Sequence, residues 1–271
     1  MIQLQELIAA DMLKKATMPK IRLEELENSI QTLKNQLPPQ VKTHFNRLIQ
    51  RHPEAIVPVF GNNCSGCGMS LTKSLLLTTR KAEQLTRCPN CTRFLYYPES
   101  MVERKRTNRK WGKTRKVGIE RFSSPELMLP KLTGTSGDEV LEQLCNRMAS
   151  AGFVIDGSHL LKMAEQREAI VSTAVDTGLA FPHVRGVEGG GLTMALGIHK
   201  KGVKFGGPGR TLTRVFFFMV IPTATSAFYL KLVAGLAKTF RDKTARDQLL
   251  AAKTEEELWK ALIKTTKKTI K

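Results

Sequence analysis

Residues 167–185, REAIVSTAVDTGLAFPHVR, decide how the second half of this chain is interpreted. An apolar, strand-like run at 178–181 ends at Pro182, which lacks a backbone N–H and therefore favours the end of a strand. His183 is then expected where a strand meets a loop, and loops on a rigid scaffold often carry functional side chains. A neutral imidazole is a nucleophile near pH 7, because its ordinary pKa is about 6.5. A lone Pro-His pair is more often an ordinary loop histidine, so the surrounding residues must decide.

Cationic and hydroxyl donors flank His183 in the sequence. Arg167 and Arg185 can pair with a phosphoryl group, and Ser172 and Thr173 can donate hydrogen bonds to it. This combination favours a phosphoryl group carried on the imidazole of His183.

The stretch also resembles the type-2 enzyme IIA domains of the phosphoenolpyruvate:sugar phosphotransferase system, the fructose, mannitol and nitrogen-regulatory class. Matching segments follow in the same order over about half of the chain: Arg167-Glu168, Ser172-Thr173, 178–183, 216–222, 237–243 and 250–258. The resemblance implies that His183 accepts a phosphoryl group from the carrier protein HPr. It makes Arg167, Arg185 and Thr173 the candidate site residues beside it.

Two positions depart from this family's pattern. Tyr229 stands where the family has a second histidine, and a phenol can donate a hydrogen bond but is uncharged at neutral pH. We include Tyr229 among the candidate site residues. Asp176 replaces a glycine of the family's turn, and a carboxylate beside the site would oppose a phosphoryl dianion.

Two Cys-x-x-Cys pairs give the strongest structural signal. Cys64 and Cys67 are separated from Cys88 and Cys91 by twenty residues, a spacing that predicts a structural zinc ion with four thiolate ligands. Such an ion contributes on the order of 10 kcal/mol to folding. Redox-active pairs are the alternative.

The same region resembles bacterial four-cysteine zinc-ribbon proteins with a coiled-coil N-terminus, through residues 37–39, 55–59 and 88–96. This resemblance implies binding or scaffolding. The leucines and isoleucine that precede it form a heptad seam: Leu23, Leu26, Ile30, Leu33 and Leu37. The seam can be covered by neighbouring helices of the same chain or by a second chain.

A strongly basic stretch follows the second cysteine pair. From Arg104 to Lys116, eight of thirteen residues are Lys or Arg, and the net charge of the chain is +19. Such a stretch could replace counterions on nucleic-acid phosphates. It could equally be a solvated linker.

We therefore expect a multi-domain chain: a helical hairpin or short coiled coil at 1–52, a zinc ribbon at 53–97, a basic linker at 98–125 and a IIA-like domain at 126–271. The last should be an α/β domain with a mixed sheet flanked by helices. Residues 192–198 and 202–205 are expected to form a hairpin-like pair, and 215–220 a buried central strand. No apolar run reaches the ~18–20 residues of a membrane span, and no signal peptide begins the chain, so we expect a cytoplasmic protein.

Two classes of function remain open. In the first, the chain is a phosphocarrier or regulatory protein, and therefore a phosphotransferase, that takes a phosphoryl group from HPr on His183 and passes it to a IIB protein or a regulatory target. In the second, it is a zinc-ribbon adaptor or nucleic-acid-binding regulatory protein whose degenerate IIA-like domain works without phosphorylation.

Overall fold

The computed structural model describes residues 1–17, 24–52, 54–60, 62–97, 117–187, 191–206, 211–222 and 226–270. The basic stretch from Arg104 to Lys116 lies outside the described residues, so its contact with nucleic acid stays a prediction. Among the helices within these ranges, none is both long and apolar enough to cross a membrane.

The N-terminal part consists of three helices, α1 (Ile2–Thr17), α2 (Glu24–Asn35) and α3 (Pro39–Arg51). Leu26 and Ile30 of the heptad seam are buried in one hydrophobic core with residues of α1 and α3, and Leu33 and Leu37 pack against it partly buried, while Leu23 lies outside the described residues. The chain's own neighbouring helices therefore cover the seam.

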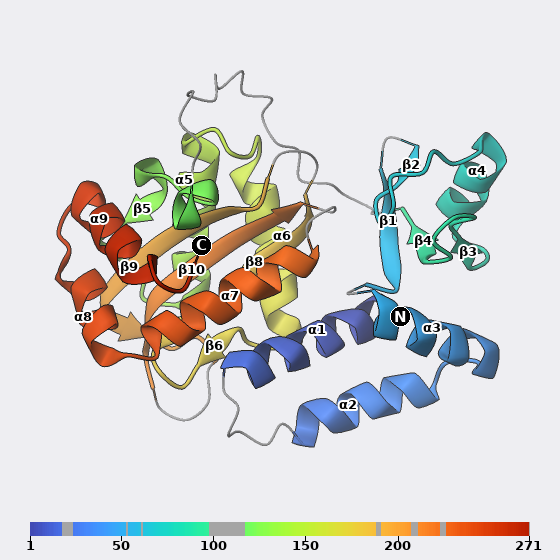
Figure 1. The fold of residues 1–271 in the computed structure, drawn as a ribbon, viewed down its shortest axis with the longest axis horizontal. Coiled ribbons are helices and arrows are strands. Elements are labelled where there is room, and N and C mark those ends of the chain that lie inside the picture. The colour runs from blue at the N-terminus through green and yellow to red at the C-terminus, as the bar shows by residue number, and fades with distance from the viewer. Residues whose placement is uncertain are drawn as a thin grey trace.

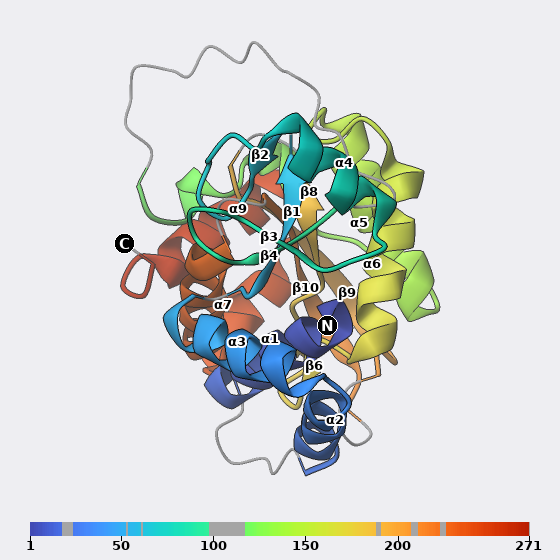
Figure 2. The same cartoon turned by 90° about the vertical axis from the view of Figure 1, so that its right-hand side faces the viewer.

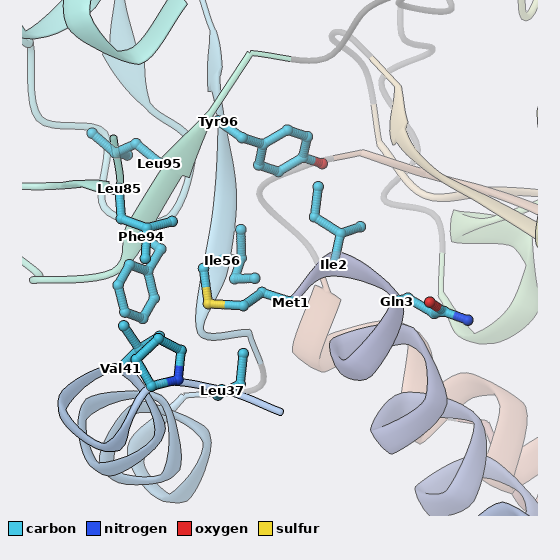
Figure 3. A pocket seen from close by; sticks show the side chains of 11 residues that line it. Met1, Ile2, Gln3, Leu37, Val41, Ile56, Leu85, Phe94, Leu95 and Tyr96 are labelled. Carbon is cyan, nitrogen blue, oxygen red and sulfur yellow. The ribbon is translucent and has the colours of Figure 1, made fainter. Parts of the chain in front are cut away.

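The cysteine region is a small four-stranded sheet in the order β2-β1-β4-β3. Its elements are β1 (Ile56–Phe60), β2 (Asn63–Cys64), α4 (Lys73–Lys81), β3 (Thr86–Arg87) and β4 (Phe94–Tyr96). Ile56 and Phe94 pack into the core of the N-terminal helices. Figure 3 shows the side chains of Met1 and Ile2, at the start of α1, facing Ile56 and Tyr96 of the ribbon.

The C-terminal half is an α/β domain built on a mixed sheet in the order β5-β9-β10-β7-β6, with β8 also paired to β10. Its strands are β5 (Met128–Leu129), β6 (Ala174–Val175), β7 (Leu179–Ala180), β8 (His183–Val187), β9 (Thr193–Val203) and β10 (Thr213–Pro222). Helices α5 (Gly137–Ser150) and α6 (Gly157–Ile170) cover one face, and α7 (Ser226–Phe240) and α9 (Glu255–Thr266) cover the other (Figures 1 and 2). Three short helices complete the domain: η1 (Gly118–Arg121), η2 (Pro125–Leu127) and α8 (Lys243–Ala251).

The central strand is β10, as its apolar run predicts. Residues 215–222 are buried, because β9 pairs with one edge of the strand and β7 and β8 pair with the other. The hydrophobic core of this domain begins at Ile119, a few residues before the boundary expected at 126.

Two local expectations are wrong. The segments 192–198 and 202–205 do not form a pair, because β9 runs unbroken from Thr193 to Val203 and pairs with β10 instead. The chain also does not enter a loop after Pro182. β8 begins at His183, since β10 is long enough to pair with β7 before the proline and with β8 after it.

Helix α1 joins the two halves of the molecule. It packs against α6 and α7 of the C-terminal domain as well as against α2 (Figure 1). Ile170 and Val171, at the end of α6, contact the core of the N-terminal helices.

Candidate functional site

His183 lies at the break between two strands. The carbonyl of Pro182 still accepts a hydrogen bond from the N–H of Met219, at 2.9 Å, so the strand pairing holds the histidine backbone in place on both sides. The side chain is 1% exposed. A rigid sheet thus presents one imidazole in a buried position.

Hydrogen bonds define the tautomer of His183. Arg167 Nε lies 3.1 Å from Nε2, and the carbonyl oxygen of Phe181 lies 3.0 Å from Nδ1. Because a guanidinium only donates and a carbonyl only accepts, Nε2 carries the lone pair and Nδ1 carries the proton. Nε2 is therefore the ring atom that could act as a nucleophile.

The surroundings keep this ring neutral. Burial, followed by the positive charges of Arg167 and Arg185, lowers the pKa of His183 well below its ordinary value of 6.5. The hydrogen bond to Phe181 acts in the opposite direction but is weaker. His183 therefore keeps its lone pair at neutral pH and below.

Arg185 and Tyr229 lie together beside the histidine. Nη2 of Arg185 donates a hydrogen bond to the hydroxyl of Tyr229, and the guanidinium lies 4.7 Å from the centre of the phenol ring. The rings of Tyr229 and His183 are 5.4 Å apart between centroids. The structure therefore brings together four of the five predicted site residues: His183, Arg167, Arg185 and Tyr229.

Arg185 stays charged although only 14% of its side chain is exposed. Burial opposes its charge, but contacts with Tyr229, Glu6 and Glu54 more than offset this and raise its pKa. The site therefore contains a permanent cation next to a neutral imidazole.

Thr173 has a different partner from the one expected. Its hydroxyl and its backbone N–H donate to the two carboxylate oxygens of Glu168, at 2.8 and 2.6 Å, and the hydroxyl of Ser172 donates to the carbonyl of Phe205. In this conformation the single hydroxyl proton of Thr173 is committed to Glu168, at the end of α6. The pair fixes the connection between α6 and β6.

Asp176 does not lie beside the imidazole. It is exposed in the turn between β6 and β7. Leu179 of β7 pairs with Val215, and His183 of β8 pairs with Met219, four residues further along β10. That separation of four strand residues corresponds to about 13 Å. The expected repulsion between Asp176 and a phosphoryl group therefore does not arise.

Two acidic residues from the N-terminal part complete the site, and neither was predicted. Glu6, on α1, lies 3.6 Å from Nε of Arg167 and 3.8 Å from Nη1 of Arg185, and Glu54 lies 3.5 Å from the same Nη1 atom. Neither glutamate belongs to a motif. The only sequence signal is an acidic residue on the apolar face of a helix, which is weak.

The four cysteines of the ribbon form a second site. Their Sγ atoms all lie within 4.8 Å of one another, with 3.7 Å between Cys64 and Cys91 and 3.6 Å between Cys67 and Cys88. Four thiolates around a tetrahedral zinc ion, with bonds of about 2.3 Å, lie roughly 3.8 Å apart. The residues therefore fit a four-thiolate metal site with no ligand position left open.

The two cysteine turns have the same backbone geometry. The N–H groups of Gly68 and Thr92 donate to the carbonyls of Cys64 and Cys88, at 2.7 and 3.0 Å. Gly68 and Thr92 both have a positive φ, 77° and 60°, four residues after the first cysteine of each turn. This repeated turn directs each pair of sulfur atoms toward the other pair.

Similar proteins are known for both parts of the chain. Residues 63–95 match the C4-type zinc ribbon domain. The nitrogen regulatory protein of Pseudomonas aeruginosa is 26% identical over 148 residues, which cover 54% of this chain and 96% of that protein.

Two solved structures resemble the chain over about half of its length. The IIA-Ntr protein of Neisseria meningitidis has a TM-score of 0.48 and 20% identity, covering 52% of this chain and 96% of its own. The mannitol IIA protein of Escherichia coli has a TM-score of 0.43 and 15% identity, covering 51% and 97%.

The resemblance inferred from residues 167–185 is confirmed by the family match. Residues 121–265, more than half of the chain, match the type-2 IIA domain (EIIA 2) of the phosphoenolpyruvate-dependent sugar phosphotransferase system. The chain belongs to this family, with a C4-type zinc ribbon joined to its IIA domain.

Proposed function

We propose that this protein is a regulatory phosphocarrier that accepts a phosphoryl group on Nε2 of His183 from the phosphohistidine of an HPr-like carrier protein. The observation that supports this most directly is the neutral, Nδ1-protonated ring of His183 between two guanidinium groups. The family supplies the same expectation independently. A cytoplasmic location is part of this proposal.

The transfer forms one bond and breaks one. The lone pair of Nε2 attacks phosphorus as the phosphorus–nitrogen bond of the donor breaks, and the donor ring leaves with the bonding electron pair as neutral imidazole when its other nitrogen is protonated. The proton stays on Nδ1 of His183, which donates a hydrogen bond to the carbonyl of Phe181; this hydrogen bond stabilises the positive charge that the ring acquires.

The neighbouring side chains have distinct roles in this proposal. Arg167 and Arg185 neutralise the phosphoryl oxygens, which carry most of the charge in the transition state. Tyr229 accepts a hydrogen bond from Arg185, so its own proton remains for a phosphoryl oxygen. Thr173 acts as a positioning residue through Glu168.

The remaining elements fit a regulatory protein. A IIB-like protein or a regulatory target would receive the phosphoryl group. The four cysteines would hold a structural zinc ion, because four thiolates leave no position for a substrate.

The test is phosphate transfer from phosphoenolpyruvate through enzyme I and HPr to the full-length protein. We expect acid-labile phosphate on the wild type and none on His183→Ala. Tyr229→His, which restores the family's second histidine, should also be labelled. Phosphate that persists on His183→Ala would contradict the assignment of this residue.

A phosphorylation-independent adaptor is the second candidate. The observation that favours it is the burial of His183, which is 1% exposed and whose neighbours Arg167 and Arg185 pair with Glu6 of the N-terminal part. If the wild type stays unlabelled while Tyr229→His is labelled, the domain has lost its transfer activity and is retained for binding.

A further inference from the structure

The geometry points to a built-in inhibitory contact at this site: helix α1 places the carboxylate of Glu6 between Arg167 and Arg185, in the position of a phosphoryl group, and phosphorylation of His183 displaces the helix. This inference rests on the proposed function and names its regulation.

Glu6 occupies the anion position of the site. Its two carboxylate oxygens face the two arginines that flank the imidazole, Oε2 toward Nε of Arg167 and Oε1 toward Nη1 of Arg185. Nε of Arg167 is also the donor that holds the nucleophilic Nε2 atom of His183. A phosphoryl group on Nε2 would need the same donors, so carboxylate and phosphoryl group compete for them.

The carboxylate is a poor occupant of this position. Its contacts with the arginines are 3.6 and 3.8 Å long, beyond hydrogen-bond distance. Among the described residues, none makes a hydrogen bond to Oε2 of Glu6 or to Nε of Arg185, although both atoms are buried. A phosphoryl group has three acceptor oxygens and about twice the charge, so it can satisfy donors that Glu6 leaves unpaired.

The two anions cannot share the site. A phosphoryl dianion on His183 would lie beside the carboxylates of Glu6 and Glu54, in a region that the protein shields from water. Like charges at such distances repel strongly where the effective dielectric constant is low. The repulsion acts directly on α1, because Glu6 is part of that helix.

One stripe of α1 faces the charged residues Arg167, Arg185 and Glu168 of the C-terminal domain. Glu6, Ala10 and Lys14 follow one another at intervals of four, so they lie on one face of the helix. Ala10 is buried, and Lys14 lies within electrostatic reach of Glu168. Glu6, at one end of the stripe, lies opposite Arg167, and Lys14, at the other end, lies near Glu168; Arg167 and Glu168 are consecutive on α6.

Helix α1 is also hydrogen-bonded to the zinc ribbon. Oε1 of Gln5 accepts hydrogen bonds from the backbone N–H groups of Ala55 and Ile56, both at 2.8 Å, and its Nε2 donates to the carbonyl of Ile56 at 3.0 Å. Tyr96 of β4 faces the start of α1 (Figure 3), and burial, together with the charges of Glu6 and Glu54, raises its pKa. A signal at His183 thus reaches the zinc ribbon through α1.

The test compares phosphorylation rates of full-length variants, using an HPr-like carrier that has been phosphorylated beforehand. Glu6→Gln removes the competing charge at nearly constant volume, and Ala10→Gln adds bulk beneath the helix without altering an arginine partner. We expect both variants to be labelled at least roughly fivefold faster than the wild type. Glu25→Gln, on the exposed surface of α2, makes the same charge change away from the site and should match the wild type.

A second measurement follows the helix itself. Hydrogen exchange of the amides of residues 2–17 should become faster once the wild type is phosphorylated. Equal labelling rates for all variants, with unchanged exchange in α1, would overturn the inhibitory contact and leave the phosphocarrier function intact. Failure of every variant to be labelled, while the carrier itself is phosphorylated, would reject the phosphocarrier function and the contact with it. Labelling of Glu6→Gln and Ala10→Gln, but not of the wild type, would support both.

Discussion

The properties of His183 come from its neighbours rather than from the residue alone. Burial and then the charges of two arginines lower its pKa, and the same positive charges would suit the phosphoryl group proposed for this site. Lower basicity weakens the lone pair as a nucleophile, but it also keeps that lone pair available at any pH near neutrality. The site gains an anion-binding position at the cost of some nucleophilicity.

The depressed pKa of His183 predicts a specific pH dependence of stability. In the unfolded chain His183 binds a proton below pH ~6.5, whereas in the folded protein its ring stays neutral there. The contribution of this residue to the stability of the fold is therefore complete above that pH and is lost as pH falls toward the pKa of the folded state. Between pH 7.5 and 5.5 the free energy of unfolding should fall by about 1 kcal/mol more in the wild type than in His183→Gln. Urea unfolding of the C-terminal domain measures this through Trp259 in a Trp111→Phe background. Equal losses in both proteins would show that His183 is not held neutral.

Residues close together in sequence were the predictable part of the site. His183, Arg167 and Arg185 fall within nineteen residues, and a family motif covers them. Glu6 and Glu54 could not be found this way, because each pairs with an arginine more than one hundred residues away. The hydrogen-bond partner of the Thr173 hydroxyl could not be predicted either, because it depends on how α6 positions the carboxylate of Glu168.

At the level of elements, sequence patterns identified the helices and the central strand better than the breaks between strands. Pro182 removes one donor, but β10 is ten residues long and restores pairing directly after it. The strand β9 likewise continues through His199 and two lysines, because a register shift in β10 accommodates the irregularity. Such continuity is decided by the partner strand and not by the local sequence.

The link between α1 and β1 gives a prediction about elements. Gln5→Ala leaves two backbone N–H groups and one carbonyl without their partner in a buried place, which should cost roughly 2 kcal/mol in opening free energy. Protection of the α1 and β1 amides against hydrogen exchange provides the measurement. Gln3→Ala removes an exposed glutamine from the same helix and should change protection by less than about 0.5 kcal/mol. If both substitutions had the same effect, Gln5 would not be the joint between helix and ribbon.

Across the whole molecule, the C4-type zinc ribbon and the His183 site are connected by a short path. The four cysteines lie together in the two turns next to β1 and β4. Gln5 bonds β1 to α1, and Glu6, the next residue on α1, contacts the arginines. No motif predicts this path, because it depends on how two separately recognisable domains pack. A ribbon that binds a target could therefore alter access to His183, and phosphorylation could alter the ribbon in return, since such coupling is reciprocal.

Removal of the metal tests this path from its far end. If the four cysteines hold the proposed zinc ion, its removal takes away their cross-link and loosens β1. The backbone partners of Gln5 then no longer hold α1 over the arginines. After chelation and desalting, we expect wild-type His183 to be labelled several-fold faster by a phosphorylated carrier, roughly as fast as Glu6→Gln with its metal. Glu6→Gln should gain little from chelation, because its helix is already released, and re-addition of zinc should return the wild type to its slow rate. The metal content of each sample is measured in parallel. A labelling rate that stays constant while the metal is lost would show that α1 closes the site without help from the ribbon.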